Sequence, residues 1–494
     1  MKRKLLLLAP LALFWLAACG GPDGPSVVLI TIDTQRSDHL SAYGYERPTS
    51  PRIAELAAQG VLFETAYSQT NSTNPSHTTI MTGRYVKTHG VSDNTLGFAR
   101  TDIPTLAERF HDAGYATAAV ISTGHLNQAH SGLGRGFDQF MDVKPRPGTP
   151  EDAFPDWTRP ASEAVDWALQ WIADQGSHPY FIWIHVFDPH MPYIPDPPYE
   201  EALGTGRAGR VATMGKVFDR ELSLDDLFLQ QPDLTPMERE LYEATYRREI
   251  PIEAMIYNGV HWTEAEVASF RSLYDAEILQ TDTALGRLFA ALEASQGAGA
   301  PVVALTGDHG EVFGKGGVFF DHRGIYSPSV RVPLIFWHPG DLLAGQRRTE
   351  VVQGIDIAPT LLELAGLDEG QELPGRSLVP LLRGTGEVAP MPIFIEHANG
   401  AAVAMIEGRW KLIISLLEGR DDVDPLVYRH AAEELYDLVA DPGENNDLSA
   451  VEPERVERMR SKILAWLALD RGSGGNAELS PAMRKQLQAL GYID

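Results

Sequence analysis

The sequence predicts an α/β fold, with a mostly parallel central sheet and helices on both of its faces. Five short apolar runs rich in β-branched residues are typical of buried strands. These runs are residues 27–32, 116–121, 181–186, 302–305 and 332–337. Segments with apolar residues at helical spacing lie between them. These segments are residues 51–59, 103–113 and 161–174. Alternation of this kind is typical of a sandwich in which helices cover a sheet.

Two parts of the chain depart from this alternation. Residues 200–262 are helix-like but poorly periodic, and they predict an insertion that either lies on the surface or covers the site as a lid. A long amphipathic helix is predicted at residues 263–296. After residue 390 short strands and turn residues precede a helical segment, which predicts a small antiparallel sheet with a terminal helix. We therefore expect a main domain at 26–390, an α+β subdomain at 391–470 and a tail helix within 471–494.

The N-terminus predicts export and a lipid anchor. Three basic residues at positions 2–4 precede a short apolar run, which is typical of a signal peptide and too short for a membrane span. The sequence Leu16-Ala17-Ala18-Cys19 then resembles a bacterial lipobox. We expect a lipoprotein signal peptide at 1–18, a membrane anchor on Cys19 and a flexible tether at 19–25, hence a periplasmic or cell-surface lipoprotein. The alternative is a simple secretory signal with an incidental cysteine.

The net charge and the cysteine content each exclude one kind of interaction. The formal net charge is −26, and such an acidic protein repels phosphate backbones, so nucleic acid is not an expected partner. Cys19 is the only cysteine, so no disulfide can form within the chain.

Carboxylates and imidazoles follow several of the predicted strands. Asp33 follows the first strand, and Asp308 and His309 follow the strand at 302–305. His190 and His125 follow two others. Ligands of open α/β sheets bind beyond the carboxyl ends of the strands, so these side chains predict a site. Two carboxylates and one imidazole suit a divalent cation that acts as a Lewis acid. The alternative for any single Asp is a turn or a helix cap.

Thr73 stands just before a predicted helix. Pro75 suits the first turn of a helix over residues 76–85. The amides and dipole of that helix would face the Thr73 hydroxyl, or a sulfate or phosphate held beside it. A metal bound to this oxygen would lower its pKa. The alternative is that Thr73 only caps the helix.

Several motifs together resemble the sulfatases of the alkaline phosphatase superfamily, over roughly residues 26–494. The run Thr73-Asn74-Pro75-Ser76-His77 resembles their active-site signature. The other matching segments are residues 28–39, 187–193, 306–311, 322–326, 408–411 and 434–437. The resemblance implies an alkaline-phosphatase-like sandwich with a C-terminal antiparallel subdomain. It also implies one divalent metal ion, Ca²⁺ or Mn²⁺ and alternatively Zn²⁺, held by Asp33, Asp308, His309 and Thr73.

The resemblance further assigns His190 and His322 to the ester group, with His125 beside them. These histidines and Thr73 are the expected catalytic residues. Four departures from the family pattern bear on the chemistry. Thr73 replaces the cysteine or serine that becomes formylglycine, and oxidation of a secondary alcohol gives a ketone instead of an aldehyde. His77 replaces an arginine and Thr34 a second aspartate. The expected lysine near residues 122–125 is missing, where His125 partly stands in.

Three functions follow as expectations. The first is a metal-dependent sulfuric ester hydrolase that works without formylglycine on an anionic ester outside the cytoplasm, which is a sulfated carbohydrate or, alternatively, an aryl sulfate. The second is a phosphodiesterase or phosphotransferase with Thr73 as nucleophile, because a direct alcohol nucleophile suits that branch of the superfamily. The third is a non-catalytic protein that binds anions or glycans.

Overall fold

The structure is a computed structural model that describes most of the chain. The described residues are 22, 24–145, 157–204, 206–207, 211, 223–230, 235–236, 239, 243, 262–295, 299–367, 372–417 and 430–469. The predicted signal peptide, Cys19, most of the predicted insertion and the predicted tail helix lie outside them. Among the described residues, no helix is long and apolar enough to cross a membrane.

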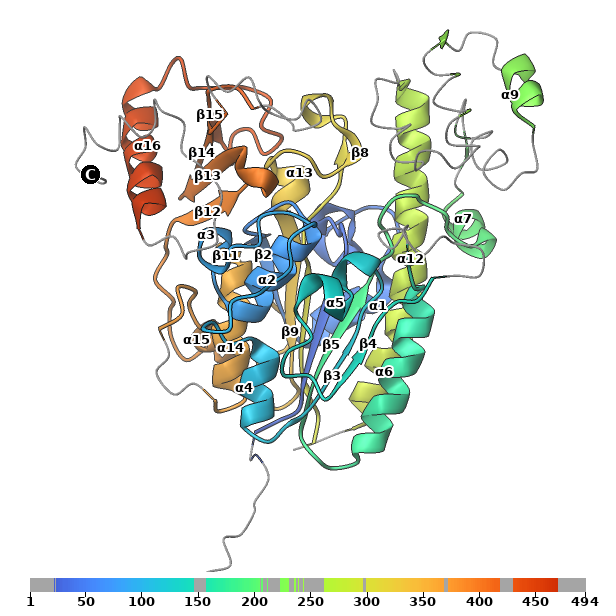
Figure 1. Ribbon diagram of the computed structural model, residues 1–494, viewed down its shortest axis with the longest axis vertical. Coiled ribbons are helices and arrows are strands. Elements are labelled where there is room, and N and C mark those ends of the chain that lie inside the picture. The colour runs from blue at the N-terminus through green and yellow to red at the C-terminus, as the bar shows by residue number, and fades with distance from the viewer. Residues whose placement is uncertain are drawn as a thin grey trace, which may run out of the picture.

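A nine-stranded sheet forms the centre of the main domain, in the order β10-β2-β9-β6-β1-β5-β3-β4, with β11 also paired to β2 (Figure 1). Its strands are β1 (Val27–Ile32), β2 (Val61–Tyr67), β3 (Ala116–Val120), β4 (Gln139–Met141), β5 (Tyr180–Val186), β6 (Val302–Gly307), β9 (Arg331–Trp337), β10 (Gln346–Arg348) and β11 (Val352–Gln353). Of the described strands in this sheet, β9 alone runs antiparallel to its neighbours. The mostly parallel sheet agrees with the prediction from sequence.

Helices cover both faces of this sheet (Figure 1). One face carries α1 (Pro51–Gln59), α6 (Ala161–Gln175) and α12 (Glu264–Ala294), and the other carries α2 (Thr73–Thr82), α4 (Leu106–Asp112), α14 (Ile357–Leu364) and α15 (Val379–Arg383). The pleat of β1 divides its side chains between the two cores. Val28, Ile30 and Ile32 pack with the first set, and Val27 and Leu29 with the second.

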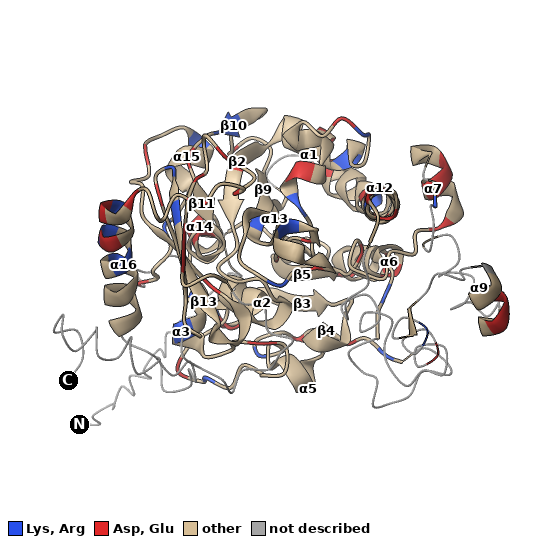
Figure 2. Cartoon of the chain, turned by 90° about the horizontal axis from the view of Figure 1, so that it is seen from above, with Lys and Arg blue, Asp and Glu red and all other residues tan. Residues whose placement is uncertain are grey.

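Several short helices and one hairpin lie in the connections between the larger elements. They are α3 (Val86–His89), α5 (Gln128–Ser131), α7 (Pro197–Leu203), α9 (Leu224–Gln230), α13 (Ser327–Val330) and the hairpin of β7 (Val312–Phe313) and β8 (Phe319–Asp321). Figure 2 shows acidic residues on the outlying helices α7 and α9, which agrees with the strong negative charge of the chain.

The C-terminal subdomain is a four-stranded antiparallel sheet with one helix, as predicted. The sheet order is β12 (Ile393–Glu396), β13 (Ala402–Glu407), β14 (Trp410–Ser415) and β15 (Glu433–Asp437), and the helix is α16 (Pro453–Ala468). One face packs on α16, and the other packs on Tyr67, Ile325 and Val330 of the main domain. A fully buried ion pair joins Lys411 of β14 to Glu444 at 2.6 Å.

One predicted helix is displaced. The helix expected at 76–85 begins at Thr73 and ends at Thr82, so Thr73 lies in its first turn. Ser72, in an extended conformation, is the N-cap residue. Thr73 therefore does not cap this helix.

Candidate active site

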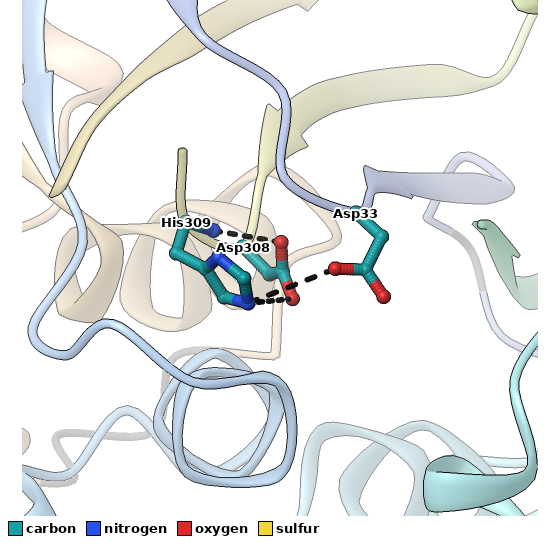
Figure 3. Close-up of side chains that lie close together, drawn as sticks. All are labelled: Asp33, Asp308 and His309. Carbon is teal, nitrogen blue, oxygen red and sulfur yellow. Dashed lines mark hydrogen bonds and ion pairs between the residues drawn. The ribbon is translucent and has the colours of Figure 1, made fainter. Parts of the chain in front are cut away.

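Two neighbouring strands bring the predicted metal ligands together. β1 and β6 pair in parallel with Ile32 opposite Gly307, so the residues that follow them are level. One ligand atom each from Asp33, Asp308 and His309 lies within 4.8 Å of the others. Nε2 of His309 is 3.6 Å from Oδ1 of Asp33 and 3.4 Å from Oδ2 of Asp308 (Figure 3). All three residues are buried.

Hydrogen bonds orient Asp308 and His309 as ligands. Oδ1 of Asp308 accepts the N–H groups of Thr34, at 3.2 Å, and His309, at 2.7 Å, which leaves Oδ2 facing the imidazole. Nδ1 of His309 donates to the carbonyl of Gly310 at 3.1 Å. In the neutral ring Nε2 then carries the lone pair, and this lone pair points at two carboxylates.

A cation fits this arrangement. Among the described residues, neither carboxylate oxygen of Asp33 has a partner in hydrogen-bonding geometry, although Nε2 of His185 lies 3.5 Å from Oδ2. Buried charge without a partner is unfavourable, and a divalent ion between Asp33, Asp308 and His309 would remove that penalty.

Because Asp33, Asp308 and His309 lie close together, their pKa values shift in different directions. Burial opposes ionisation of Asp33, but the contact with His185 and charge on His190 and His309 together lower its pKa below the usual range. Burial, and then the charge of Asp33, raise the pKa of Asp308 well above its usual value. Burial lowers the pKa of His309 well below 6.5. Without metal, the two carboxyl groups therefore favour a single negative charge.

Thr73 faces the same group. Its Oγ1 lies 3.4 Å from Nε2 of His309, in the first turn of α2. The backbone of Thr73 is held from the sheet side by His77, whose Nδ1 donates to the Thr73 carbonyl at 2.8 Å. The hydroxyl and the three predicted ligands thus lie at one end of the sheet.

His77 takes the place of the arginine typical of the family without carrying its charge. Its Nε2 lies 3.0 Å from Oγ1 of Thr31, which also accepts the indole N–H of Trp183 at 2.9 Å. Because Nδ1 donates to a carbonyl, the Thr31 hydroxyl donates to Nε2 in the neutral ring. Burial, and then the nearby His185, lower the pKa of His77 to about 3. His77 is therefore neutral near pH 7.

The three predicted catalytic histidines also lie at this end. The ring of His322 is 4.2 Å from that of His309 and 6.1 Å from that of His190. Nδ1 of His322 donates to the carbonyl of Asn71 at 2.5 Å, and Nδ1 of His190 donates to that of Met191 at 2.6 Å. Both neutral rings therefore carry their lone pair on Nε2.

His125 lies in the short turn after β3 and is close enough to His190, Asp33 and His322 to interact with their charges. Burial, and then His190, lower its pKa to about 4. Asp188, which also follows β5, is differently placed, because its Oδ2 accepts the N–H of Ala161 at the start of α6. The catalytic roles of His125, His190, His322 and Thr73 stay predictions.

Sequence analysis missed His185 as a part of this site. It lies inside β5, where its Nδ1 accepts the N–H of Ser122 at 3.1 Å and its Nε2 faces Asp33. It is the only histidine in the strand YFIWIHV. A histidine within an otherwise apolar, fully buried strand was the available signal.

Comparisons with known proteins identify the family of the chain. The model of the Sulfatase family matches residues 25–367, and that of the C-terminal part of N-sulphoglucosamine sulphohydrolase matches residues 314–467. The chain is 24% identical to an N-acetylglucosamine-6-O-sulfatase of Bacteroides thetaiotaomicron, over 90% of this chain and 86% of that protein. It is 25% identical to arylsulfatase K of Xenopus laevis, over 84% and 77%.

Solved structures share the fold. One, of a protein in complex with its substrate D-glucosamine-2-N,6-O-disulfate, matches with a TM-score of 0.66 at 20% identity, over 91% of this chain and 99% of that chain. The phosphonate monoester hydrolase of Agrobacterium radiobacter matches with a TM-score of 0.64 at 23% identity, over 90% and 95%. These matches confirm the predicted alkaline-phosphatase-like fold.

Proposed function

The chain belongs to the sulfatase family of hydrolases, and on this premise we propose that it is a metal-dependent sulfuric ester hydrolase that works without formylglycine. The observation that carries the proposal is the Thr73 hydroxyl, 3.4 Å from Nε2 of His309 within the candidate metal group. The side chain is a secondary alcohol, so oxidation cannot supply the aldehyde on which formylglycine chemistry depends.

Asp33, Asp308, His309 and Thr73 would hold one divalent ion. Oxygen donors dominate this set, which suits Ca²⁺ or Mn²⁺ better than Zn²⁺. When bound, the ion would act as a Lewis acid toward the ester oxygens and would lower the pKa of the hydroxyl. Binding to Nε2 is compatible with the hydrogen bond that His309 Nδ1 donates to Gly310.

The chain's own residues then carry out two successive substitutions at sulfur. Thr73 Oγ1 forms a bond to sulfur while the bond from sulfur to the ester oxygen breaks, and the hydroxyl proton passes to the leaving alcohol through an imidazole. Water next attacks the sulfated threonine, its proton goes to Nε2 of His190 or His322, and the bond from sulfur to Thr73 breaks. Sulfate leaves and Thr73 regains its proton.

We propose a sulfated carbohydrate outside the cytoplasm as the substrate. Support comes from the relatives, since one is named for N-acetylglucosamine-6-O-sulfate ester cleavage and another structure holds a glucosamine disulfate. The lipobox-like sequence before Cys19 supports a periplasmic or cell-surface lipoprotein that is anchored in the membrane at that residue.

A phosphorus ester is the second candidate. The phosphonate monoester hydrolase of Agrobacterium radiobacter has the same fold over 90% of this chain. An alcohol nucleophile also suits phosphoryl transfer, because it needs no prior oxidation. In this case Thr73 would carry a phosphoryl or phosphonyl group in place of a sulfuryl group.

An activity panel tests the proposal. The purified protein is assayed with aryl sulfate, sulfated N-acetylglucosamine, phosphonate monoester and phosphodiester, with Mn²⁺, Ca²⁺ or Zn²⁺. Turnover of the sulfates that falls by about a thousandfold or more in Thr73→Ala supports it. Thr78→Ala is the matched control and should retain activity, because this buried threonine of the same helix donates its hydroxyl to the Asn74 carbonyl one turn earlier.

The other outcomes are distinct. Sulfatase activity that survives Thr73→Ala contradicts the nucleophile assignment. Turnover confined to the phosphorus esters, with a mass adduct on Thr73, favours the second candidate. Binding of sulfated sugar without any turnover favours a non-catalytic protein.

A further inference from the structure

The residue directly after Asp33 has an unusual backbone. Thr34 has φ of +50°, in the left-handed region. This region is unfavourable for a β-branched side chain and is rarely occupied unless surrounding contacts impose it. Thr34 therefore needs an external partner to keep this conformation.

The unusual turn at Thr34 serves Asp308. In this conformation the Thr34 N–H donates to Oδ1 of Asp308 at 3.2 Å. Together with the bond from the His309 N–H, it occupies Oδ1 and leaves Oδ2 for the candidate metal group. Asp33 is fixed from the other side, because its own N–H donates to the Val186 carbonyl at 3.0 Å. The backbone of one turn thus orients two predicted ligands.

Tyr274 of α12 holds this turn. Its hydroxyl donates to the Thr34 carbonyl at 2.8 Å and accepts the Arg36 N–H at 2.9 Å, so one oxygen bridges the backbone on both sides of Gln35. The side chain is fully buried. The next residue of the helix, Asp275, bonds to His39 at 2.7 Å, so α12 also holds the loop further along.

We propose that Tyr274 is a positioning residue for the metal site: its hydroxyl keeps Thr34 left-handed, and Thr34 in turn orients Asp308. Among the described residues, Tyr274 forms no hydrogen bond with a predicted ligand, and it acts through the backbone of Thr34. Loss of a group that bonds directly to a metal ligand, as the Thr34 N–H does, typically changes metal affinity by ten- to a hundredfold.

The test is metal binding by Tyr274→Phe, which removes one oxygen. Mn²⁺ and Ca²⁺ alone are titrated into the full-length protein by calorimetry, with circular dichroism as a check on folding. We expect the dissociation constant to rise by about tenfold or more. Tyr436→Phe is the matched control, because that buried hydroxyl bonds to Glu434 in the C-terminal subdomain at 2.7 Å. It should leave the dissociation constant unchanged.

The same substitution in a Thr34→Gly variant distinguishes a role in holding Thr34 from a role in packing alone. Glycine adopts positive φ without strain, so Thr34→Gly needs less support from Tyr274. We expect Tyr274→Phe to weaken metal binding by less than about threefold when Thr34 is already glycine. An equal fold loss in both backgrounds overturns the proposal, as does an unchanged dissociation constant in Tyr274→Phe alone. If that single variant does not fold, the double variant is compared with Thr34→Gly alone: a loss below about threefold supports the proposal, and a loss of about tenfold or more overturns it.

The inference rests on the metal site proposed above, and the two fail differently. A wild-type protein that binds no divalent ion contradicts the site itself. A wild-type protein that binds the ion, with a Tyr274→Phe variant that binds it equally well, contradicts only the role of Tyr274.

Discussion

Asp308→Asn should have opposite effects on stability with and without metal. The amide oxygen can keep the two backbone hydrogen bonds that Oδ1 accepts from Thr34 and His309. The amide nitrogen would then replace Oδ2, the oxygen that faces Nε2 of His309 at 3.4 Å. The substitution therefore removes a buried charge and a metal ligand but keeps the local fold.

The size of the effect follows from the spacing of the two carboxylates. Full charges on Asp33 and Asp308, with ligand atoms within 4.8 Å, repel by about 3 kcal/mol at an effective dielectric constant of about 20. Because burial and Asp33 raise the pKa of Asp308, this penalty grows as pH rises above the ordinary carboxyl range. The metal-free variant should therefore be more stable than the metal-free wild type, by up to about 3 kcal/mol, and the gain should increase with pH.

Metal should reverse this order. An ion present at a thousand times its dissociation constant stabilises the wild type by about 4.1 kcal/mol, which exceeds the metal-free advantage of the variant, whereas the variant itself should gain little. The measurement is urea unfolding at several pH values in EDTA and in excess Mn²⁺. A variant that is less stable than the wild type in EDTA, or that Mn²⁺ stabilises equally, refutes the reasoning.

A matched control shows whether the sign of the stability change is specific to Asp308. Asp356 is also buried, but it pairs with Arg376 at 2.7 Å. Asp356→Asn breaks this pair, so it should destabilise the protein by about 3 kcal/mol, with and without metal. The same chemical change should thus stabilise at one buried aspartate and destabilise at the other.

Two further predictions concern the C-terminal subdomain. Burial opposes charge on Glu434, but hydrogen bonds led by that from His430 lower its pKa to about 2, from 4.5; its contribution is present above pH 4.5 and lost as pH falls toward 2. Glu434→Gln should therefore lose less stability than the wild type between pH 5 and pH 3 in urea unfolding, and parallel curves would contradict this. Lys411→Met leaves Glu444 buried without its cation, so it should cost about 3 kcal/mol. Lys411→Met with Glu444→Gln should recover most of that loss, and a double variant as unstable as the single one argues against the pair.

Local patterns in the sequence sufficed for much of the fold. β1 and α1 have the predicted bounds, because an unbroken apolar run and a proline-led amphipathic segment are both local signals. β2 was missed because Glu64 and Thr65 interrupt its apolar residues, at the point where its pairing with β9 shifts register. The antiparallel direction of β9 was not predictable either, since a strand's direction depends on its partners.

At the site, too, local sequence signals identified some residues, whereas others depend on contacts between distant parts of the chain. Asp33, Asp308 and His309 were predictable because they follow apolar strands, where parallel sheets place ligands. Tyr274 was not, because an aromatic residue on the buried stripe of a long helix is usually a core residue. Only the fold shows that its hydroxyl lies against Thr34, which is 240 positions away in the sequence.

The pairing of β1 with β6 also bears on how such enzymes diverge. Hydrogen bonds between the two strands fix Ile32 opposite Gly307, whatever the length of the chain that connects them. Insertions in this long connection, such as the one predicted at 200–262, can therefore be gained, lost or exchanged without moving Asp33 relative to Asp308. Substrate choice can evolve in that connection while the chemistry at the strand ends stays constant.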